Sequence, residues 1–410
     1  MKVPESLSLA FGSDFERLIS DFISQENLLP ADTTLASNRF LSRAVIPHIL
    51  KLSQLFNRED KSQASSLPAY WKESSNPQNL RLAYFLYFMP CNLFRMASIW
   101  AELSRLGFEW KPKQLQGIEF GAGPASGLCG IAAGETFASL GLPSSAQWAL
   151  IEQDQAILEM GAKWAQTYTQ SLGALDWGVR TFHRKIDLKR GFLPKSAPSF
   201  HLWLMSYYLN ELEISPQELA PLLLNAWIDH LEEEGIAILM EPALRLQSRK
   251  LLELRKALLL EIKKQKRDDF LLLLPCLGHQ NCGALENPDD WCHEEVTWWR
   301  PPYLRKLDDL AQLDRKSLPF SYLVIMRTKR KREEVLPAIN RAPENRRHRL
   351  VSPAHSEGRD LEFFTCGQDG KKRARLRTEQ TIQRGDILLG SQLRGDSNAS
   401  RVEGSPTVIE

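Results

Sequence analysis

Seven short apolar segments alternate with helical stretches between residues 117 and 327, and this alternation constrains the fold more than any other feature of the chain. The predicted strands are 117–120, 148–152, 179–183, 200–206, 235–241, 269–275 and 320–327. Helical periodicity fills several of the gaps between them, for example at 155–172 and 243–265. Strands that alternate with helices form a mainly parallel sheet with helices on both faces. We therefore predict an α/β domain over residues 111–328, whose ligand lies beyond the carboxyl ends of its strands.

The flanking segments differ in character. Residues 1–110 carry apolar residues at helical spacing and predict a helical N-terminal domain, with Pro90 as a kink and Cys91 in its core. Residues 329–392 begin as a basic connector and continue as short strands, which predict a small β domain with its β unit at about 345–392. Residues 393–410 contain few apolar residues and are predicted to be disordered.

Composition and charge narrow the class of protein. The net charge is +2, and 43% of the 410 residues are hydrophobic, so the chain can bury more than one core. No apolar run approaches the roughly 20 residues of a membrane span. The first residues lack a basic start followed by an apolar block, and they include Glu5, Asp14 and Glu16, which a transit peptide avoids. We expect no membrane association, a bacterial cytoplasm as the compartment, and a monomer when the protein is not bound to its partner.

The segment IEFGAGPASG predicts a cofactor pocket at the end of the first strand. Gly121 and Gly123 allow a sharp turn and a close approach of the backbone to a ligand. The third glycine, Gly127, follows after four residues, whereas a pyrophosphate-binding turn needs it after three. The carboxylate of Glu119 would repel a diphosphate and attract the ammonium group of S-adenosylmethionine. The pattern favours a methyl donor over a dinucleotide.

Later strand ends supply further candidates for this pocket. Glu152 closes the second strand, where related folds place a carboxylate on ribose hydroxyls, and Asp154 is the competing candidate. Asp187 follows the third strand and could accept a hydrogen bond from the adenine amino group; a solvated turn aspartate is an equal alternative. No catalytic residue is identified. The polar residues nearest the expected transfer site are Ser206, Asn210 and Glu211.

Four of the six cysteines form a pattern that predicts one metal site after the sixth strand. They are Cys276, Cys282, Cys292 and Cys366. Five, nine and seventy-three residues separate them, whereas zinc sites pair their ligands at shorter spacings. Wide spacing suits a [4Fe-4S] cluster, with zinc as the alternative. His279 and His293 lie beside the cysteines and could replace a thiolate in a zinc site, although bystander positions fit them better.

The expected strand order indicates the role of this metal site. In the order 3-2-1-4-5-7-6 the sixth strand lies four spacings from the first, about 19 Å at about 4.8 Å each. A metal at the cysteines therefore lies away from the methyl donor. It would connect the loop at 276–319 to the C-terminal unit through Cys366.

Several segments together resemble a known family. IEFGAGPASG, LMEPALRLQSRKLLELR, PCLGHQNC with DWCHEE, FSYLVIMR, and CGQDGKKRARLR with a later RGD are similar to the methyltransferase-like family associated with the mitochondrial small ribosomal subunit, which also has bacterial members. The resemblance covers roughly residues 80–390. It implies a seven-stranded class I S-adenosylmethionine methyltransferase-like (Rossmann-like) fold and association with small-subunit ribosomal RNA. It also implies a [4Fe-4S] cluster on the four cysteines and a methyl-donor pocket that includes Glu119, Gly121 and Gly123.

The basic residues near the cysteines agree with an RNA partner. Residues 327–350 hold nine Lys or Arg against three Glu, and a second basic group lies at 371–377. Trp291, Trp298, Trp299 and Tyr303 could stack on bases, although such aromatics more often cover a core. The leading hypothesis is a methyltransferase-like protein that binds or modifies small-subunit ribosomal RNA. The alternatives are a catalytically inactive assembly factor and a small-molecule methyltransferase with a structural zinc.

Overall fold

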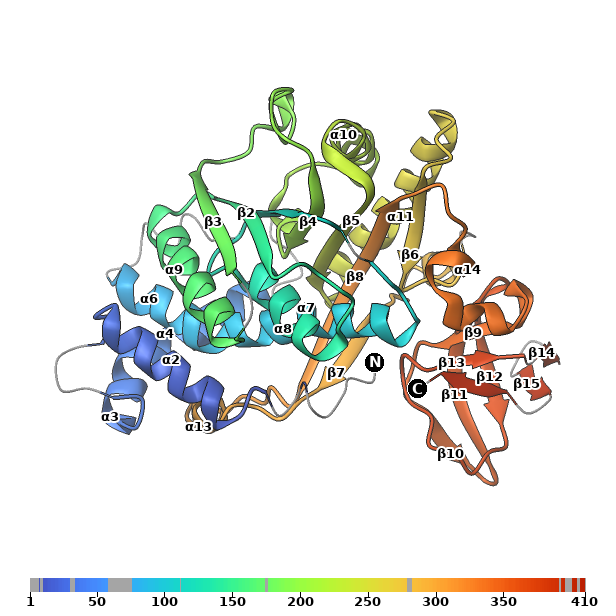
Figure 1. Cartoon of the computed structure of the whole chain (residues 1–410). Helices are drawn as coiled ribbons and strands as arrows, with labels where there is room; N and C mark the ends of the chain where they lie inside the picture. The colour runs from blue at the N-terminus through green and yellow to red at the C-terminus, as the bar shows by residue number, and fades with distance from the viewer. Residues whose placement is uncertain are drawn as a thin grey trace.

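A central mixed sheet and a second, smaller sheet organise the chain (Figure 1). The computed structural model describes residues 7, 10–29, 34–57, 76–110, 112–173, 176–278, 282–390, 392–394, 400–403 and 406–409. The strands of the central sheet are β1 (Leu115–Phe120), β2 (Ser145–Glu152), β3 (Asp176–His183), β4 (Phe200–Ser206), β5 (Leu231–Pro242), β6 (Phe270–Leu274), β7 (Glu294–Thr297) and β8 (Ser317–Arg327). Their order is β3-β2-β1-β4-β5-β8-β6, and β7 pairs with β8.

This order confirms the predicted fold class. Strands β1 to β5 pair in parallel, and β8 runs antiparallel to both β5 and β6. All seven predicted strands are present, and they take the order 3-2-1-4-5-7-6 when β8 is counted as the seventh. The short strand β7 was not predicted; it lies inside the cysteine-rich loop and extends the pairing of β8.

Helices cover both faces of the central sheet. The main helices are α2 (Ser13–Gln25), α4 (Ile46–Phe56), α6 (Pro77–Ala83), α7 (Met89–Arg105), α8 (Ser126–Ala138), α9 (Gln155–Ser171), α10 (Pro216–His230), α11 (Arg245–Lys264) and α13 (Pro302–Ala311). Alternate residues of β4 point to opposite sides: Leu202 and Leu204 join the core under α7, α8 and α9, while Trp203 and Met205 join the core under α10 and α11. This two-sided burial explains why the strand sequences are apolar throughout.

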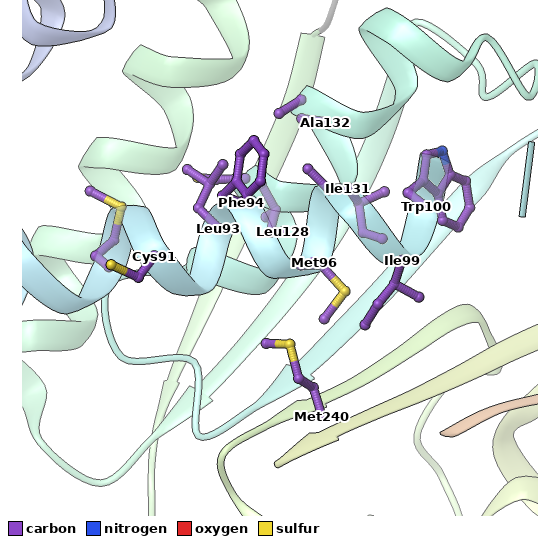
Figure 2. Close-up of a cluster of buried hydrophobic side chains, with 14 of the residues drawn as sticks. Cys91, Leu93, Phe94, Met96, Ile99, Trp100, Leu128, Ile131, Ala132 and Met240 are labelled. Carbon is purple, nitrogen blue, oxygen red and sulfur yellow. The ribbon is translucent and has the colours of Figure 1, made fainter. Parts of the chain in front are cut away.

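The N-terminal helices pack directly against this sheet. Figure 2 shows Leu93, Phe94 and Met96 of α7 beside Leu128 and Ile131 of α8. The indole N–H of Trp100 donates to the Glu135 carboxylate at 2.9 Å across the same helix pair. Cys91 is buried in this core, as predicted, and its thiol donates to the carbonyl of Tyr87. The N-terminal helices and the central sheet therefore share one apolar core.

Two π-helical turns interrupt the N-terminal helices, and each ends just before a proline. They span Leu41–Val45 and Tyr84–Phe88, ahead of Pro47 and Pro90. A proline lacks an amide N–H, and its ring clashes with the carbonyl four residues earlier. The wider turn accommodates the ring, which is the physical form of the kink predicted at Pro90.

The second sheet lies next to β6, β8 and the cysteine-rich loop (Figure 1). Its strands are β9 (Arg347–Leu350), β10 (His355–Glu357), β11 (Asp360–Gly367), β12 (Gly370–Leu376), β13 (Ile387–Leu389), β14 (Gln392–Arg394), β15 (Ser400–Glu403) and β16 (Thr407–Ile409). The order is β14-β15-β12-β11-β9-β13-β16, and β10 pairs with β11. These strands extend the predicted small β unit beyond residue 392.

The prediction of a disordered tail at 393–410 is wrong for the described residues. Strand β16 pairs antiparallel with β13, and the Arg105 guanidinium donates to the carbonyl of Ile409 at 2.6 Å. The segment is polar because β14 and β15 are exposed strands, and its few apolar residues, such as Val402 and Ile409, are the ones that are buried.

Candidate functional site

A glycine turn joins β1 to α8 at the carboxyl edge of the central sheet. Gly121 and Gly123 adopt φ values of +62° and +48°, a region that other residues enter only with strain. A Cβ atom on Gly121 would lie 2.6 Å from Cδ2 of Tyr208, so the Tyr208 ring packs directly on the turn. The amides of Gly123, Gly127 and Leu128 at this turn are bound by the protein's own carboxylates, which hold the start of α8.

Glu119 lies beneath the turn and is fully buried. Its carboxylate accepts hydrogen bonds from the amides of Gly127 and Leu128, both at 2.9 Å. Burial raises the pKa of Glu119 to about 7, although these two N–H groups act in the opposite direction. A Cβ atom on Gly127 would lie 2.5 Å from the carboxylate, which explains the third glycine. In the structure Glu119 holds the first turn of α8, and its contact with the methyl donor stays a prediction.

Glu152 ends β2 and reaches the same turn. Its carboxylate accepts from the amide of Gly123 at 3.1 Å, and also from Gln153 and Asp154 at 2.7 and 3.1 Å. Burial raises the pKa of Glu152, while the three N–H groups act to lower it. The structure brings Glu152 together with Gly121, Gly123 and Glu119, as the sequence predicted.

The competing candidate, Asp154, is engaged elsewhere. It accepts from the amide of Ile157 at the start of α9 and forms a two-point ion pair with Arg81 at 2.9 and 2.7 Å. Burial alone would raise the pKa of Asp154, but the hydrogen bond and charge of Arg81 lower it. Arg81 and α9 hold Asp154, whereas Glu152 accepts directly from Gly123 of the glycine turn, so Glu152 is the better candidate for contact with a ligand in this pocket.

Asp187 lies on an exposed turn after β3. It caps a short 3-10 helix by accepting from the amide of Lys189 at 3.1 Å, and its carboxylate lies 3.5 Å from Arg190. This is the geometry of the solvated turn aspartate that the sequence left open. Contact with an adenine ring stays a prediction.

Two tyrosines near the turn were not predicted. Tyr208 follows β4, and Tyr84 lies in the second π-helical turn; burial and the nearby charges of Glu211 and Glu152 raise the pKa of both phenols. The preceding residue, Tyr207, has a φ of +58°, an unusual conformation for a bulky side chain that occurs more often at functional sites. The π-helical turn is a structural signal of the same kind. The apolar periodicity of the sequence predicts neither the positive φ of Tyr207 nor the π-helical turn.

The four predicted cysteines line one cavity, which we call the cysteine cavity. Cys276 follows β6, Cys282 precedes the short helix α12 (Gly283–Glu286), Cys292 precedes β7, and Cys366 lies on β11. The cavity has a volume of about 50 Å³ and lies between the central sheet, the loop and the second sheet. His293 also lines it, whereas His279 lies outside the described residues.

The thiols lie close enough together that the charges of some raise the pKa of others. Burial raises the pKa of Cys292, and the charges of Cys276, Cys366 and Cys282 raise it further. Burial and the charges of Cys276 and Cys282 raise the pKa of Cys366 to about 12. Within the described ranges, no group of three or more His, Cys, Asp or Glu side chains is arranged so that it could hold a metal ion. The assignment of a metal to the cysteines therefore stays a prediction.

Most of the chain matches one protein family. Residues 78–392, more than half of the chain, match the family described as "Mitochondrial small ribosomal subunit Rsm22". The chain belongs to the Rsm22 family. A comparison with curated proteins found no match.

Several solved methyltransferase structures are distantly similar to this Rsm22-family chain. The plantazolicin methyltransferase BpumL, in complex with SAH, shares 15% identity, with 69% of this chain and 99% of that chain covered and a TM-score of 0.36. The O-methyltransferase from Bacillus cereus, in complex with SAH, shares 8% identity, with 75% and 96% covered and a TM-score of 0.29. The fold assignment rests on the strand order of the central sheet.

Cationic side chains fix the cysteine loop of this Rsm22-family protein in place. The guanidinium of Arg249 donates to the carbonyls of Ala284, Asn287 and Asp290 at 3.1, 2.7 and 2.7 Å. Lys371 of β12 then binds both carboxylate oxygens of Asp290 at 2.7 Å. These bonds connect the loop to α11 on one side and to the second sheet on the other.

A buried ion network connects the cysteine cavity to α7. Arg349, which lines the cavity and is 2% exposed, pairs with Glu294 at 2.8 Å and with Glu102 at 2.7 Å. Arg105 also pairs with Glu102 at 2.7 Å. Burial alone would raise the pKa of Glu102, but Arg349 and Arg105 outweigh it and lower the pKa to about 2. The network joins an N-terminal helix, the loop and the second sheet.

Three arginines of the basic stretch at 327–350 are buried and cannot contact RNA. Arg332 and Arg347 are 7% and 3% exposed, and they donate to the carbonyls of Leu272 and Ala342. Together with Arg349 they are structural cations inside the protein. The density of positive charge in sequence could not distinguish these residues from exposed ones, because burial depends on tertiary contacts.

The tryptophan cluster is also divided. Trp298 and Tyr303 are buried and belong to the main core, whereas Trp299 is 54% exposed with the Arg305 guanidinium 4.9 Å from its ring centroid. Trp291 stacks on His293 beside the cysteine cavity.

No helix in the described part of the chain is long and apolar enough to cross a membrane.

Proposed function

We propose that this Rsm22-family protein binds S-adenosylmethionine at the glycine turn and acts on small-subunit ribosomal RNA. We propose further that the four cysteines hold a [4Fe-4S] cluster. One observation carries the proposal: Cys276, Cys282, Cys292 and Cys366, which span 90 positions of sequence, meet in one cavity.

The chemistry of the cavity residues suits an iron-sulfur cluster, and we propose that the thiols move together when the cluster binds. Thiolates are the ligands that such clusters require, and four cysteine thiols that could supply them line the cavity. Arg332 and Arg255 lie within electrostatic range of Cys276 and Cys282, so their charges can compensate a cluster with four thiolate ligands. When bound, the cluster supplies metal–thiolate bonds that join the loop to the second sheet. The alternative is zinc, which the same thiolates could bind after moving closer together.

The carboxyl edge of β1 and β2 fits the methyl donor. The left-handed glycines form a sharp turn at the end of β1, and Glu152 holds that turn while it remains partly exposed. In related folds a carboxylate at the end of the second strand accepts from ribose hydroxyl groups, which is the role that we propose for Glu152. Glu119 supports this site from below by fixing α8.

Binding to RNA and methylation of RNA predict different outcomes in one experiment. Purified protein would be mixed with small ribosomal subunits and labelled S-adenosylmethionine, and both co-sedimentation and label transfer would be measured. Gly121→Val places a side chain against Tyr208, whereas Gly358→Val has a similar φ of +65° with no atom within 4 Å. An enzyme loses transfer only in the first variant.

An assembly factor co-sediments without transferring label in any variant. A small-molecule methyltransferase binds the donor but does not co-sediment with the subunits. Absence of both donor binding and co-sedimentation in the native protein would overturn the proposed function. A bacterial cytoplasm and a monomer off the ribosome stay predictions from the sequence.

A further inference from the structure

One face of the second sheet carries three arginines in a single cross-strand row. Arg375 of β12 is the register partner of Arg401 of β15, and Arg401 is the partner of Arg394 of β14. Directly opposite residues place their side chains on the same face about 5 Å apart, and like charges in these positions destabilise a sheet. Carboxylates offset this repulsion, because Arg375, Arg394 and Arg401 each lie within 3.8 Å of an acidic side chain.

An exposed aromatic ring lies beside this row. Arg373 lies two residues before Arg375 on β12 and is opposite Phe364 of β11. The Phe364 side chain is 42% exposed. The Lys371 ammonium lies 5.1 Å from the Phe364 ring centroid, and Lys371 is opposite Cys366. Because alternate residues share a face, the arginine row, the ring and Cys366 all belong to one surface. We call it the β11–β12 face.

Acidic side chains accompany the arginines on this face. The carboxylate of Glu362 serves both Arg373 and Arg375, while Arg401 lies 3.8 Å from Asp360 and Arg394 lies 3.1 Å from Glu403. Glu357, the register partner of Asp360, adds a fourth carboxylate near Arg375. The arginine side chains stay 41% to 69% exposed, so a ligand can reach them.

We propose that the β11–β12 face binds a single-stranded segment of RNA. A base stacks on Phe364, and phosphates lie along Arg375, Arg401 and Arg394. An exposed ring among guanidinium groups suits this ligand, because a base offers a flat face and the backbone offers the negative charge. A duplex keeps its bases stacked on one another and cannot use the ring. The inference rests on the proposed function, which makes ribosomal RNA the partner.

The test measures affinity for a short oligouridine with the full chain purified anaerobically. Phe364→Ala should weaken binding roughly tenfold, since one stacked base contributes about 1–3 kcal/mol. Arg394→Gln with Arg401→Gln should lower the slope of log affinity against log salt by about 1.4, at about 0.7 for each phosphate contact on a single strand.

Matched control variants come from β3, at the opposite edge of the central sheet. Phe182→Ala removes an aromatic side chain that is 45% exposed, and Arg180→Gln removes an exposed arginine. Both should bind oligouridine as the native protein does. Thermal unfolding and iron content of each variant show whether the fold is intact.

The outcomes separate this inference from the proposed function. If the native protein binds small-subunit RNA but the Phe364 and arginine variants bind oligouridine with unchanged affinity and salt slope, the inference is overturned and the proposed function stands. If these variants lose binding to intact subunits but keep their affinity for oligouridine, the face contacts protein and the RNA assignment is overturned. If the native protein binds neither oligouridine nor small-subunit RNA, both proposals fail.

Discussion

The glycine turn and the cysteine cavity are built in different ways. The turn joins neighbouring parts of the chain, from Glu119 to Leu128, and its bonds lie within one strand-turn-helix unit with Glu152 from the next strand. The cavity collects four segments from the loop and the second sheet, and buried ions connect it to α7. A local site forms whenever its own unit folds. An assembled site depends on the packing of distant segments, so a bound metal would stabilise that packing.

Loss of one cavity cysteine should have the largest effect and should leave the glycine turn intact. Cys366→Ser removes the only one of the four proposed ligands that the second sheet supplies, so we expect loss of iron and a lower unfolding temperature. Affinity for S-adenosylmethionine, measured by calorimetry, should not change. Cys91→Ser is the control, because Cys91 is buried outside the cavity and a serine can still donate to Tyr87. Equal loss of donor affinity in Cys366→Ser would show that the two sites are coupled.

Removal of the buried arginine should destabilise the assembled region next most strongly. Arg349→Met leaves Glu294 buried without the guanidinium that holds it, a change that typically costs about 3–5 kcal/mol. Urea unfolding measures this cost, and Arg346→Met, an exposed neighbour, serves as the control. A cost below about 1 kcal/mol would mean that the ion network does not hold the regions together.

The pH dependence of stability should report the buried carboxylate under the turn. Burial raises the pKa of Glu119 from 4.5 to about 7, so the folded state binds the proton more tightly than the unfolded state. The free energy of unfolding should therefore fall as pH rises from 4.5 to 7, by up to about 3 kcal/mol. Glu119→Gln should lack this component, while Glu159→Gln, on the exposed face of α9, should retain it. Parallel curves for native protein and Glu119→Gln would contradict the burial argument.

A single methyl group in the turn should have the smallest effect. In Gly121→Ala the alanine must adopt a strained left-handed conformation, and its methyl group displaces Tyr208. We therefore expect about tenfold weaker binding of S-adenosylmethionine, or about 1.4 kcal/mol. Gly358→Ala, with a similar φ and no atom within 4 Å, should lose stability but keep its donor affinity. Equal affinities in the two variants would place the donor elsewhere.

The sequence predicted the local features better than the assembled ones. Apolar runs and the glycine spacing were sufficient for the seven strands and for the turn, because these depend on neighbours in the chain. The buried state of Arg332, Arg347 and Arg349 could not be predicted, since a cation and its distant carbonyl or carboxylate partner leave no local pattern. The few apolar residues of the tail predict disorder, and its order could not be predicted because the pairing of β16 with β13 depends on a remote strand. The cysteines are an intermediate case: their number indicated one site, but only the fold shows that they meet.

The central claim is that the cysteine cavity holds an iron-sulfur cluster that joins the loop to the second sheet. Anaerobic purification followed by iron, sulfide and zinc analysis tests it most directly. We predict about four iron and four sulfide per chain in the native protein, as a [4Fe-4S] cluster requires. Stoichiometric zinc without sulfide in the native protein would contradict the claim.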